Sequence, residues 1–307
     1  MNNTQFLQNL FPPSGLIDVV LDTDAYNEVD DQFAIAYLVC SRDRLQVQGF
    51  CAAPFFNNRV SSPQEGMERS LDEIRHILTL AGREDLHDRI YRGSEQYLPD
   101  EETPVSSDAA RFLVELARHY NAAQPLYIVS IGAITNVASA LLLDPSITDK
   151  IVVVWLGGHS HHWPDTAEFN MKQDIAAARV VFDSGAPLVQ LPCRGVVDHF
   201  STTRWELAHW LGGKNVLCDY LIAQVEDYAQ RRLDPAGPWS KPLWDVTAIG
   251  WLLNEHGRFM EQEIIPCPIP EYDHQYSFEM DRYPMAYVRS IHRDTLFADL
   301  FAKLTAE

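Results

Sequence analysis

Short apolar runs alternate along the chain with longer segments in which apolar residues recur every three or four positions. The apolar runs predict buried strands at residues 16–24, 45–53, 126–132, 151–158 and 187–193. The helical spacing predicts helices at residues 30–40, 67–80, 109–123, 134–143 and 175–182. Because continuously apolar strands that alternate with helices are typical of a parallel sheet covered on both faces, the pattern predicts an α/β fold.

The last hundred residues have a mainly helical pattern, with late strands near residues 263–269 and 286–291. No repeat, low-complexity tract or shift in composition marks a linker. We therefore predict a single Rossmann-like domain over residues 1–307, with a mostly parallel central sheet flanked by helices and a mainly helical C-terminal part packed on it. Sheets of this kind place their ligand sites beyond the carboxyl ends of the strands.

Charge and cysteine content narrow the possible partners and the compartment. The formal net charge is −19, from 43 acidic and 24 basic residues, so we expect no binding to nucleic acid or to an anionic membrane. A neutral small molecule is compatible with this charge. The five cysteines are scattered and form no CxxC pair, which indicates free thiols in a reducing compartment. With neither a signal-peptide pattern nor an apolar run of membrane-spanning length, the expected compartment is the cytoplasm.

An acidic cluster follows the first predicted strand. Residues 22–31 contain five carboxylates in ten positions, directly after an apolar run and directly before an apolar helix. A solvated acidic loop is the simplest interpretation, but like charges packed at a strand end are costly unless a cation neutralises them. Carboxylate and carbonyl oxygens select calcium or magnesium. The spacing is not that of an EF-hand loop, so residues far along the chain would have to complete the coordination.

Residues 22–38, DTDAYNEVDDQFAIAYL, resemble the amino-terminal signature of the inosine–uridine-preferring nucleoside hydrolase family. That signature is an Asp-x-Asp, a short turn, and an Asp-Asp pair leading into a helix; the turn here is two residues longer than in the compact form. Four further segments follow in the family's order, at residues 51–58, 131–145, 157–178 and 241–249. The resemblance covers residues 16–255. It implies the nucleoside hydrolase fold, a homo-dimer or homo-tetramer, and calcium-dependent hydrolysis of a ribonucleoside to free base and ribose.

The resemblance also implies roles for individual residues. It assigns Ca²⁺ to the side chains of Asp24, Asp31 and Asp245 and to the backbone carbonyl of Ile131, with Asp22 orienting these ligands from behind. It assigns the ribose hydroxyls to Asp30, Glu168, Asn170, one of Asn57 and Asn58, and His162, which stands where many members have Asn. Asp24 would take a proton from the attacking water. The carboxylates would stabilise an oxocarbenium-like transition state.

Simpler structural interpretations remain open for several of these residues. Asp30 and Asp245 each precede an apolar helical run and could be helix caps. Glu168 and Asn170 could be loop residues.

The residue before the last metal-binding Asp departs from the family. Many members carry a proton-donating His there, whereas this chain has Trp244, as the purine-specific branch does. The resemblance thus favours a purine base stacked on the indole, although packing is the ordinary role of a tryptophan. Tyr91, Tyr97 and Trp163 are candidates for a second ring, and His199 is a possible proton donor. The metal and ribose residues match the family better than the base pocket does.

Two other functions fit part of the pattern. An Asp-based magnesium phosphohydrolase would use Asp22 and Asp24 after the first strand, with Ser130 ending a second. No later strand ends in the Gly-Asp pair that such enzymes need, and Glu168, Asn170 and Asp245 would have no role. A non-catalytic binder of a nucleoside or sugar is the other alternative, to which the missing His points.

Overall fold

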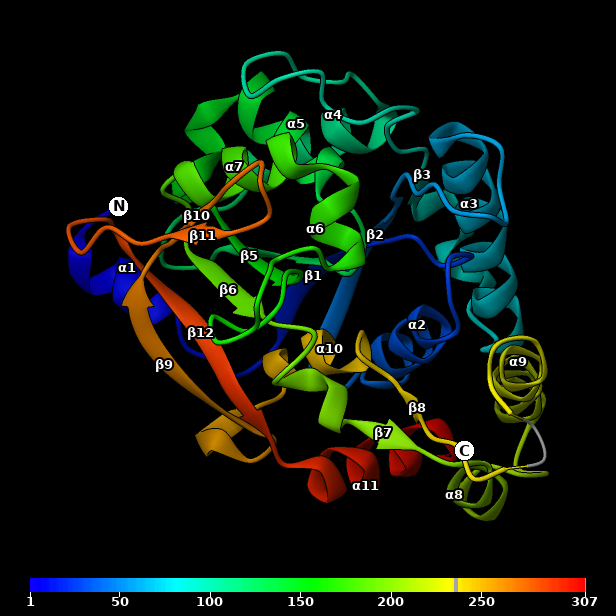
Figure 1. Cartoon of the computed structure of the whole chain (residues 1–307). Helices are drawn as coiled ribbons and strands as arrows, with labels where there is room; N and C mark the ends of the chain where they lie inside the picture. Colours follow the sequence, from blue (N-terminus) through cyan, green and yellow to red (C-terminus); the bar gives the residue numbers. More distant parts are fainter. Residues whose placement is uncertain (235–236, 307) are drawn as a thin grey trace.

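The computed structural model describes residues 1–234 and 237–306 and is built on one eight-stranded sheet (Figure 1). Its strands lie in the order β3-β2-β1-β4-β5-β6-β12-β9. The strands are β1 (Ile17–Thr23), β2 (Leu45–Ala52), β3 (Ile90–Tyr91), β4 (Leu126–Ser130), β5 (Ile151–Leu156), β6 (Leu188–Leu191), β9 (Met260–Pro266) and β12 (Pro284–Ile291). Neighbours pair in parallel except β12 and β9, which are antiparallel. The predicted α/β class and mostly parallel sheet are confirmed.

Helices cover both faces of this sheet. They are α1 (Asn3–Asn9), α2 (Asp30–Cys40), α3 (Pro63–Leu80), α4 (Asp108–Ala117), α5 (Thr135–Leu143), α6 (Phe169–Gln173), α7 (Ile175–Asp183), α8 (Arg204–Trp210), α9 (Val216–Arg232), α10 (Val246–Leu252) and α11 (Arg293–Leu304). Two short antiparallel pairs of strands lie outside the sheet: β7 (Ser201–Thr202) with β8 (Lys241–Pro242), and β10 (Ile269–Pro270) with β11 (Tyr276–Ser277). The sequence pattern missed α1 and α6, which are too short to show a helical period.

The sheet separates two hydrophobic cores. Val19 and Leu21 of β1 pack with α2 and α10 on one face, while Val20 packs with α4, α5 and α7 on the other. Successive residues of a strand point to opposite faces, so a run such as Val19–Leu21 is apolar throughout when both faces are covered. Figure 1 shows α4, α5 and α7 on one side of the sheet and α2, α10 and α11 on the other.

The C-terminal part extends the sheet as well as adding helices to it. Strand β12 lies beside β6, with Ala286 opposite Val189, and β9 forms the edge. Both late strands predicted from the sequence are therefore present, β9 beginning three residues earlier, at Met260, than expected. The pairing of β12 with β6 thus joins the C-terminal part of the chain to the parallel strands of the sheet.

The described residues include all five cysteines and the helices named above. All five cysteines are free, four of them buried and Cys40 partly so. Over residues 1–234 and 237–306, every helix is too short or too polar to cross a lipid bilayer.

Candidate functional site

The acidic cluster gathers where β1 ends. Strand β1 lies between β2 and β4, and Asp24 follows its last residue directly. Asp30 and Asp31 are the first two residues of α2, whose N-cap is Val29, with no capping side chain. Asp30 is therefore not the helix cap that the sequence allowed as an alternative, and its carboxylate is available for other contacts.

Asp245 joins the cluster from far along the chain. It precedes α10 and makes no side-chain capping hydrogen bond, so the capping interpretation does not hold for it either. Oxygens of Asp30, Asp31 and Asp245 all lie within 4.8 Å of one another, and all three residues are buried. Asp24, also buried, has one oxygen, Oδ2, without any hydrogen-bond partner.

Burial and mutual repulsion disturb the ionisation of this cluster. Burial is the largest cause that raises the pKa of Asp24, Asp31 and Asp245 above the usual range of a carboxyl group. The neighbouring carboxylates raise these pKa values further, Asp31 acting on Asp24 and Asp30 acting on both Asp31 and Asp245. Groups so placed ionise together only when positive charge is supplied. The unpartnered Asp24 oxygen and the all-oxygen donor set fit a hard divalent cation.

Lys241 supplies one positive charge, and sequence reasoning missed it. It is 1% exposed, and its Nζ lies 2.8 Å from Glu28 Oε2, 3.3 Å from Asp30 Oδ1 and 2.8 Å from the carbonyl of Pro242. All three ammonium donors are thus used. The backbone N–H of Asp245 lies 3.4 Å from the other oxygen of Asp30. Asp30 is held from two sides, whereas Asp24 and Asp31 receive no ion pair from the described residues.

The carbonyl of Ile131 lies at the end of β4, beside β1. The backbone N–H of Ile131 donates a hydrogen bond to the carbonyl of Asp22 at 2.8 Å. The carbonyl of Ile131 accepts one from Asn170 Nδ2 at 3.0 Å. Asn170 also donates to the carbonyl of Leu156 at 3.0 Å, so its amide bridges the ends of β4 and β5. A carbonyl oxygen has a second lone pair, which leaves Ile131 able to bind a cation as well.

Glu168 is the N-cap of α6 and not a loose loop residue. Its carboxylate accepts hydrogen bonds from the backbone N–H groups of Gly158, Asn170 and Met171. Burial raises the pKa of Glu168 to about 7 despite these bonds. Asp22, two residues before Asp24, is buried behind the cluster. Its carboxylate accepts hydrogen bonds from Asn136 at 2.8 Å and from Ser130 at 3.0 Å.

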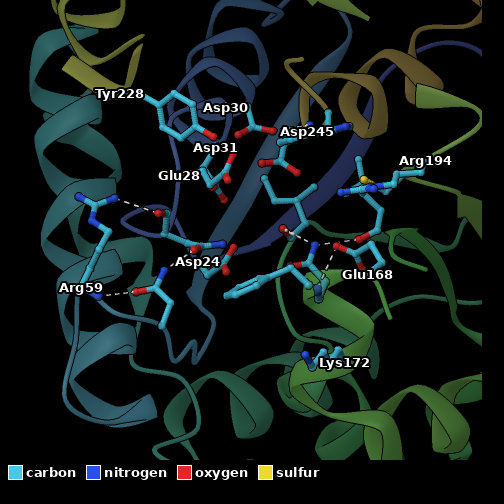
Figure 2. Close-up of a pocket in the computed structure, with 18 of the residues that line it drawn as sticks. Asp24, Glu28, Asp30, Asp31, Arg59, Glu168, Lys172, Arg194, Tyr228 and Asp245 are labelled. Carbon is cyan, nitrogen blue, oxygen red and sulfur yellow. Dashed lines mark hydrogen bonds between the residues drawn. The ribbon is translucent and has the colours of Figure 1, made fainter. Parts of the chain in front are cut away.

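These residues line a cavity of about 590 Å³ at the carboxyl ends of the strands (Figure 2). Ten of the residues expected from the sequence lie on its wall: Asp24, Asp30, Asp31, Asn57, Asn58, Ile131, Glu168, Asn170, Trp244 and Asp245. Figure 2 shows the four aspartates at the centre and Glu168 to one side. The cavity is large enough for a nucleoside-sized ligand.

The structure does not bring His162 to this cavity. His162 is exposed, and the buried His159 lines the wall instead. The reason lies in the loop between them, where the His161 ring packs 4.3 Å from that of Tyr287 and turns the next residue outward. His199 is also exposed and away from the cavity wall.

The three residues predicted as a second aromatic ring do not lie on the cavity wall. Tyr91, Tyr97 and Trp163 are not on the cavity wall, whereas Tyr228 of α9 is. No sequence signal marks Tyr228, because α9 is far from the strands in the chain and meets the site only in the folded protein. Trp244 lines the cavity, and its Nε1 is buried without a partner.

The two candidate asparagines differ in exposure. Asn57 is half-buried; its Nδ2 donates to Asn27 Oδ1 at 2.8 Å, and its Oδ1 accepts from the backbone of Arg59. Asn58 is exposed and accepts from Arg232 at 2.9 Å. Asn57 therefore has the more defined position at the cavity wall.

Comparison with known proteins gives one family. The model of the inosine-uridine preferring nucleoside hydrolase family matches residues 19–281. Pyrimidine-specific ribonucleoside hydrolase RihB of Escherichia coli is 33% identical over 140 residues, which are 42% of this chain and 42% of that protein. The matched segments cover from 42% to 54% of the curated relatives' lengths.

Two solved structures share the fold. The plant nucleoside hydrolase PpNRh1 superposes with a TM-score of 0.75 at 20% identity, covering 95% of this chain and 99% of that one. The purine-preferring ribonucleoside hydrolase of Gardnerella vaginalis superposes with a TM-score of 0.71 at 19% identity, covering 94% and 98%.

Proposed function

Because the chain belongs to the inosine-uridine preferring nucleoside hydrolase family, we propose that it hydrolyses the N-glycosidic bond of a ribonucleoside, releasing free base and ribose. The observation that carries this proposal is the buried carboxylate cluster at the end of β1, open to a cavity of about 590 Å³. The oxygen of water bonds to C1′ while the C1′–N bond breaks. The electron pair of the broken C1′–N bond goes to the base nitrogen. One proton of the water ends on the base, and the other stays on the new sugar hydroxyl.

The cation in this proposal is calcium, held by Asp24, Asp31, Asp245 and the carbonyl of Ile131. A bound divalent cation lowers the pKa of water and so supplies a nucleophile at neutral pH. Asp24 is also the carboxylate that would accept the proton of the attacking water in this proposal. Asp30 stays outside the coordination in this scheme because Lys241 already balances its charge, while the remaining lone pairs of its oxygens can accept hydrogen bonds from the sugar.

The sugar is bound by the other polar groups of the wall. Asp30, Glu168, Asn170 and Asn57 present carboxylate and amide oxygens that accept hydrogen bonds from ribose hydroxyls. Their negative charge also stabilises the positive charge that develops on the ribose ring in the transition state. His159, which lines the wall, is the histidine that this proposal assigns to the sugar in place of His162.

The base is a purine in this proposal, stacked against Trp244. The relatives named above differ in base preference, one pyrimidine-specific and one purine-preferring by name, so the indole carries this part of the proposal alone. Tyr228 is the candidate for the ring on the other side of the base. Stacking on an electron-rich ring helps to hold the base while its bond to the sugar breaks.

The test is release of free base from a panel of ribonucleosides and p-nitrophenyl riboside, first with calcium and then with a chelator. Calcium-dependent release supports the hydrolase, and the order of substrates identifies the base. If calcium binds but no base is released from any substrate, the protein is a binder or acts on another N-riboside.

A further inference from the structure

The cavity has opposite charges at its floor and at its mouth. Five of the carboxylates on its wall lie deep: Asp24, Asp30, Asp31, Asp245 and Glu168 are each at most 5% exposed. The sixth, Glu28, is partly buried and is paired with Lys241. The mouth of the cavity carries five cationic side chains, of which Arg59 is half-buried and the others exposed: Arg59, Lys172, Arg194, Arg231 and Arg232. In a chain with a net charge of −19, so many cations around one opening need an explanation beyond solubility.

Four of these five cations have no ion pair in the described part of the chain. Only Arg231 is paired, with Asp227. Elsewhere in the same protein most arginines do have a carboxylate partner, as Arg44, Arg118 and Arg293 do. A cation that served only to neutralise the acidic floor would contact it, as Lys241 contacts Asp30. The four mouth cations do not.

Arg59 and Arg232 are moreover held in place by neutral groups. Arg59 Nη1 donates to the carbonyl of Asn27 at 2.8 Å, and its guanidinium lies 4.2 Å from the centre of the Tyr26 ring. Arg232 Nη2 donates to Asn58 Oδ1 at 2.9 Å. Since Asn58 and Arg59 are adjacent, the two guanidinium groups flank the same short loop after β2. Each is oriented while keeping its full charge and most of its donors for a ligand.

Lys172 and Arg194 lie on another side of the opening. Lys172 belongs to α6, and Arg194 follows β6 and lies 5.7 Å from the Trp163 ring centre. Figure 2 shows Arg59 and Arg194 on opposite sides of the acidic centre, with Lys172 near α6. The side chains of Lys172 and Arg194 donate no hydrogen bond to a described residue. They therefore serve as a comparison for Arg59 and Arg232, which are held in place.

We propose that the substrate carries phosphate, being a nucleotide or another phosphorylated N-riboside, and that Arg59 and Arg232 bind that phosphate. This inference rests on the proposed hydrolysis at the same cavity and names its substrate class. A neutral nucleoside offers nothing to two oriented guanidinium groups, whereas a phosphate accepts paired hydrogen bonds from each. The bond that breaks is unchanged; in a nucleotide the sugar product retains the phosphate.

The test compares kcat/KM for adenosine, adenosine 5′-phosphate and adenosine 3′-phosphate, and for the same three forms of uridine. At least one phosphorylated form should exceed its nucleoside by about tenfold per arginine engaged. The advantage should shrink as salt is added, because the contact is ionic and partly exposed. If kcat/KM for each nucleoside equals or exceeds kcat/KM for both of its phosphates, the inference is overturned.

Variants on the two sides of the cavity show which pair of cations binds the phosphate. In Arg59→Gln/Arg232→Gln the ratio of nucleotide to nucleoside kcat/KM should fall toward one, and Arg59→Lys should restore part of it. The matched pair Lys172→Gln/Arg194→Gln removes the same charge from the opposite side and should leave the ratio near that of the parent. The reverse outcome would refute the assignment to Arg59 and Arg232. Unchanged melting temperatures establish that each variant is folded.

A binding measurement separates this inference from the proposed function. If no substrate is hydrolysed, calorimetry with adenosine, adenosine 5′-phosphate and inorganic pyrophosphate, in chelator, still decides the phosphate question. Tighter binding of the phosphorylated ligands, lost in Arg59→Gln/Arg232→Gln, supports the phosphate site although hydrolysis has failed. Equal or absent binding overturns it.

Discussion

Lys241 Nζ lies 3.9 Å from the centre of the Trp244 ring and 3.3 Å from Asp30 Oδ1. One buried cation therefore covers a face of the indole and holds the neighbouring carboxylate. The indole has only its other face for a base, which limits stacking to one side at this residue. The same ammonium balances part of the negative charge of the cluster, so it contacts both Trp244, proposed to bind the base, and Asp30, proposed to bind the sugar.

Lys241→Met should destabilise the protein. Removing the ammonium leaves Asp30 buried without its partner, which costs about 3–5 kcal/mol for a broken buried pair. The melting temperature should fall in chelator and recover in part with calcium, whose charge offsets the loss. The control Lys303→Met removes a partly buried cation whose partner, Asp43, is exposed, so it should change the melting temperature little. Equal stability of Lys241→Met and parent would mean that Lys241 does not brace Asp30.

Asp24→Asn should abolish turnover without unfolding the protein. The amide cannot accept the water's proton, and general-base loss lowers kcat by about 10²–10⁴-fold. Because Asp24 is repelled by its neighbours, the variant should be at least as stable as the parent in chelator. Asp72→Asn, at an exposed position of α3, is the matched control. Activity within about tenfold of the parent would remove Asp24 from the role of base.

The stability of the calcium-free protein should fall as pH rises. Burial raises the pKa of Asp22 and Glu168 to about 7, from 3.8 and 4.5. The folded state then holds more protons than the unfolded state between those values, so each group lowers the free energy of unfolding by about 1.4 kcal/mol per pH unit across the window. Thermal unfolding in chelator from pH 5 to pH 8 checks the sign. A stability that rises over this range would contradict the burial of these carboxyls as neutral acids.

Trp244→Ala should reduce hydrolysis of purine substrates more than that of p-nitrophenyl riboside. The nitrophenolate is a good leaving group and gains little from a stacking ring, whereas a purine depends on the indole for its position. Comparing kcat/KM for both substrates in variant and parent provides the measurement, with Trp205→Ala, an exposed tryptophan of α8, as control. Equal losses on the two substrates would end the stacking argument.

Much of this protein is determined by its sequence alone. The apolar runs at Ile17–Thr23 and Ile151–Leu156 specify buried parallel strands because both faces of such strands are covered. The start of α2 at Asp30, directly after the acidic run, follows from local pattern too, and so does the meeting of Asp24 and Asp31 at one strand end. These features depend on residues close together in the chain.

Only the tertiary structure decided which distant groups complete the site. Lys241 reaches Asp30, and Tyr228 and Arg232 reach the cavity, because α9 and β8 pack near α2 and the loop after β2. His159 lines the wall in place of His162 because His161 packs on Tyr287, a residue of β12. Such contacts depend on how elements far apart in the sequence bury their surfaces against one another, and no local pattern carries that information.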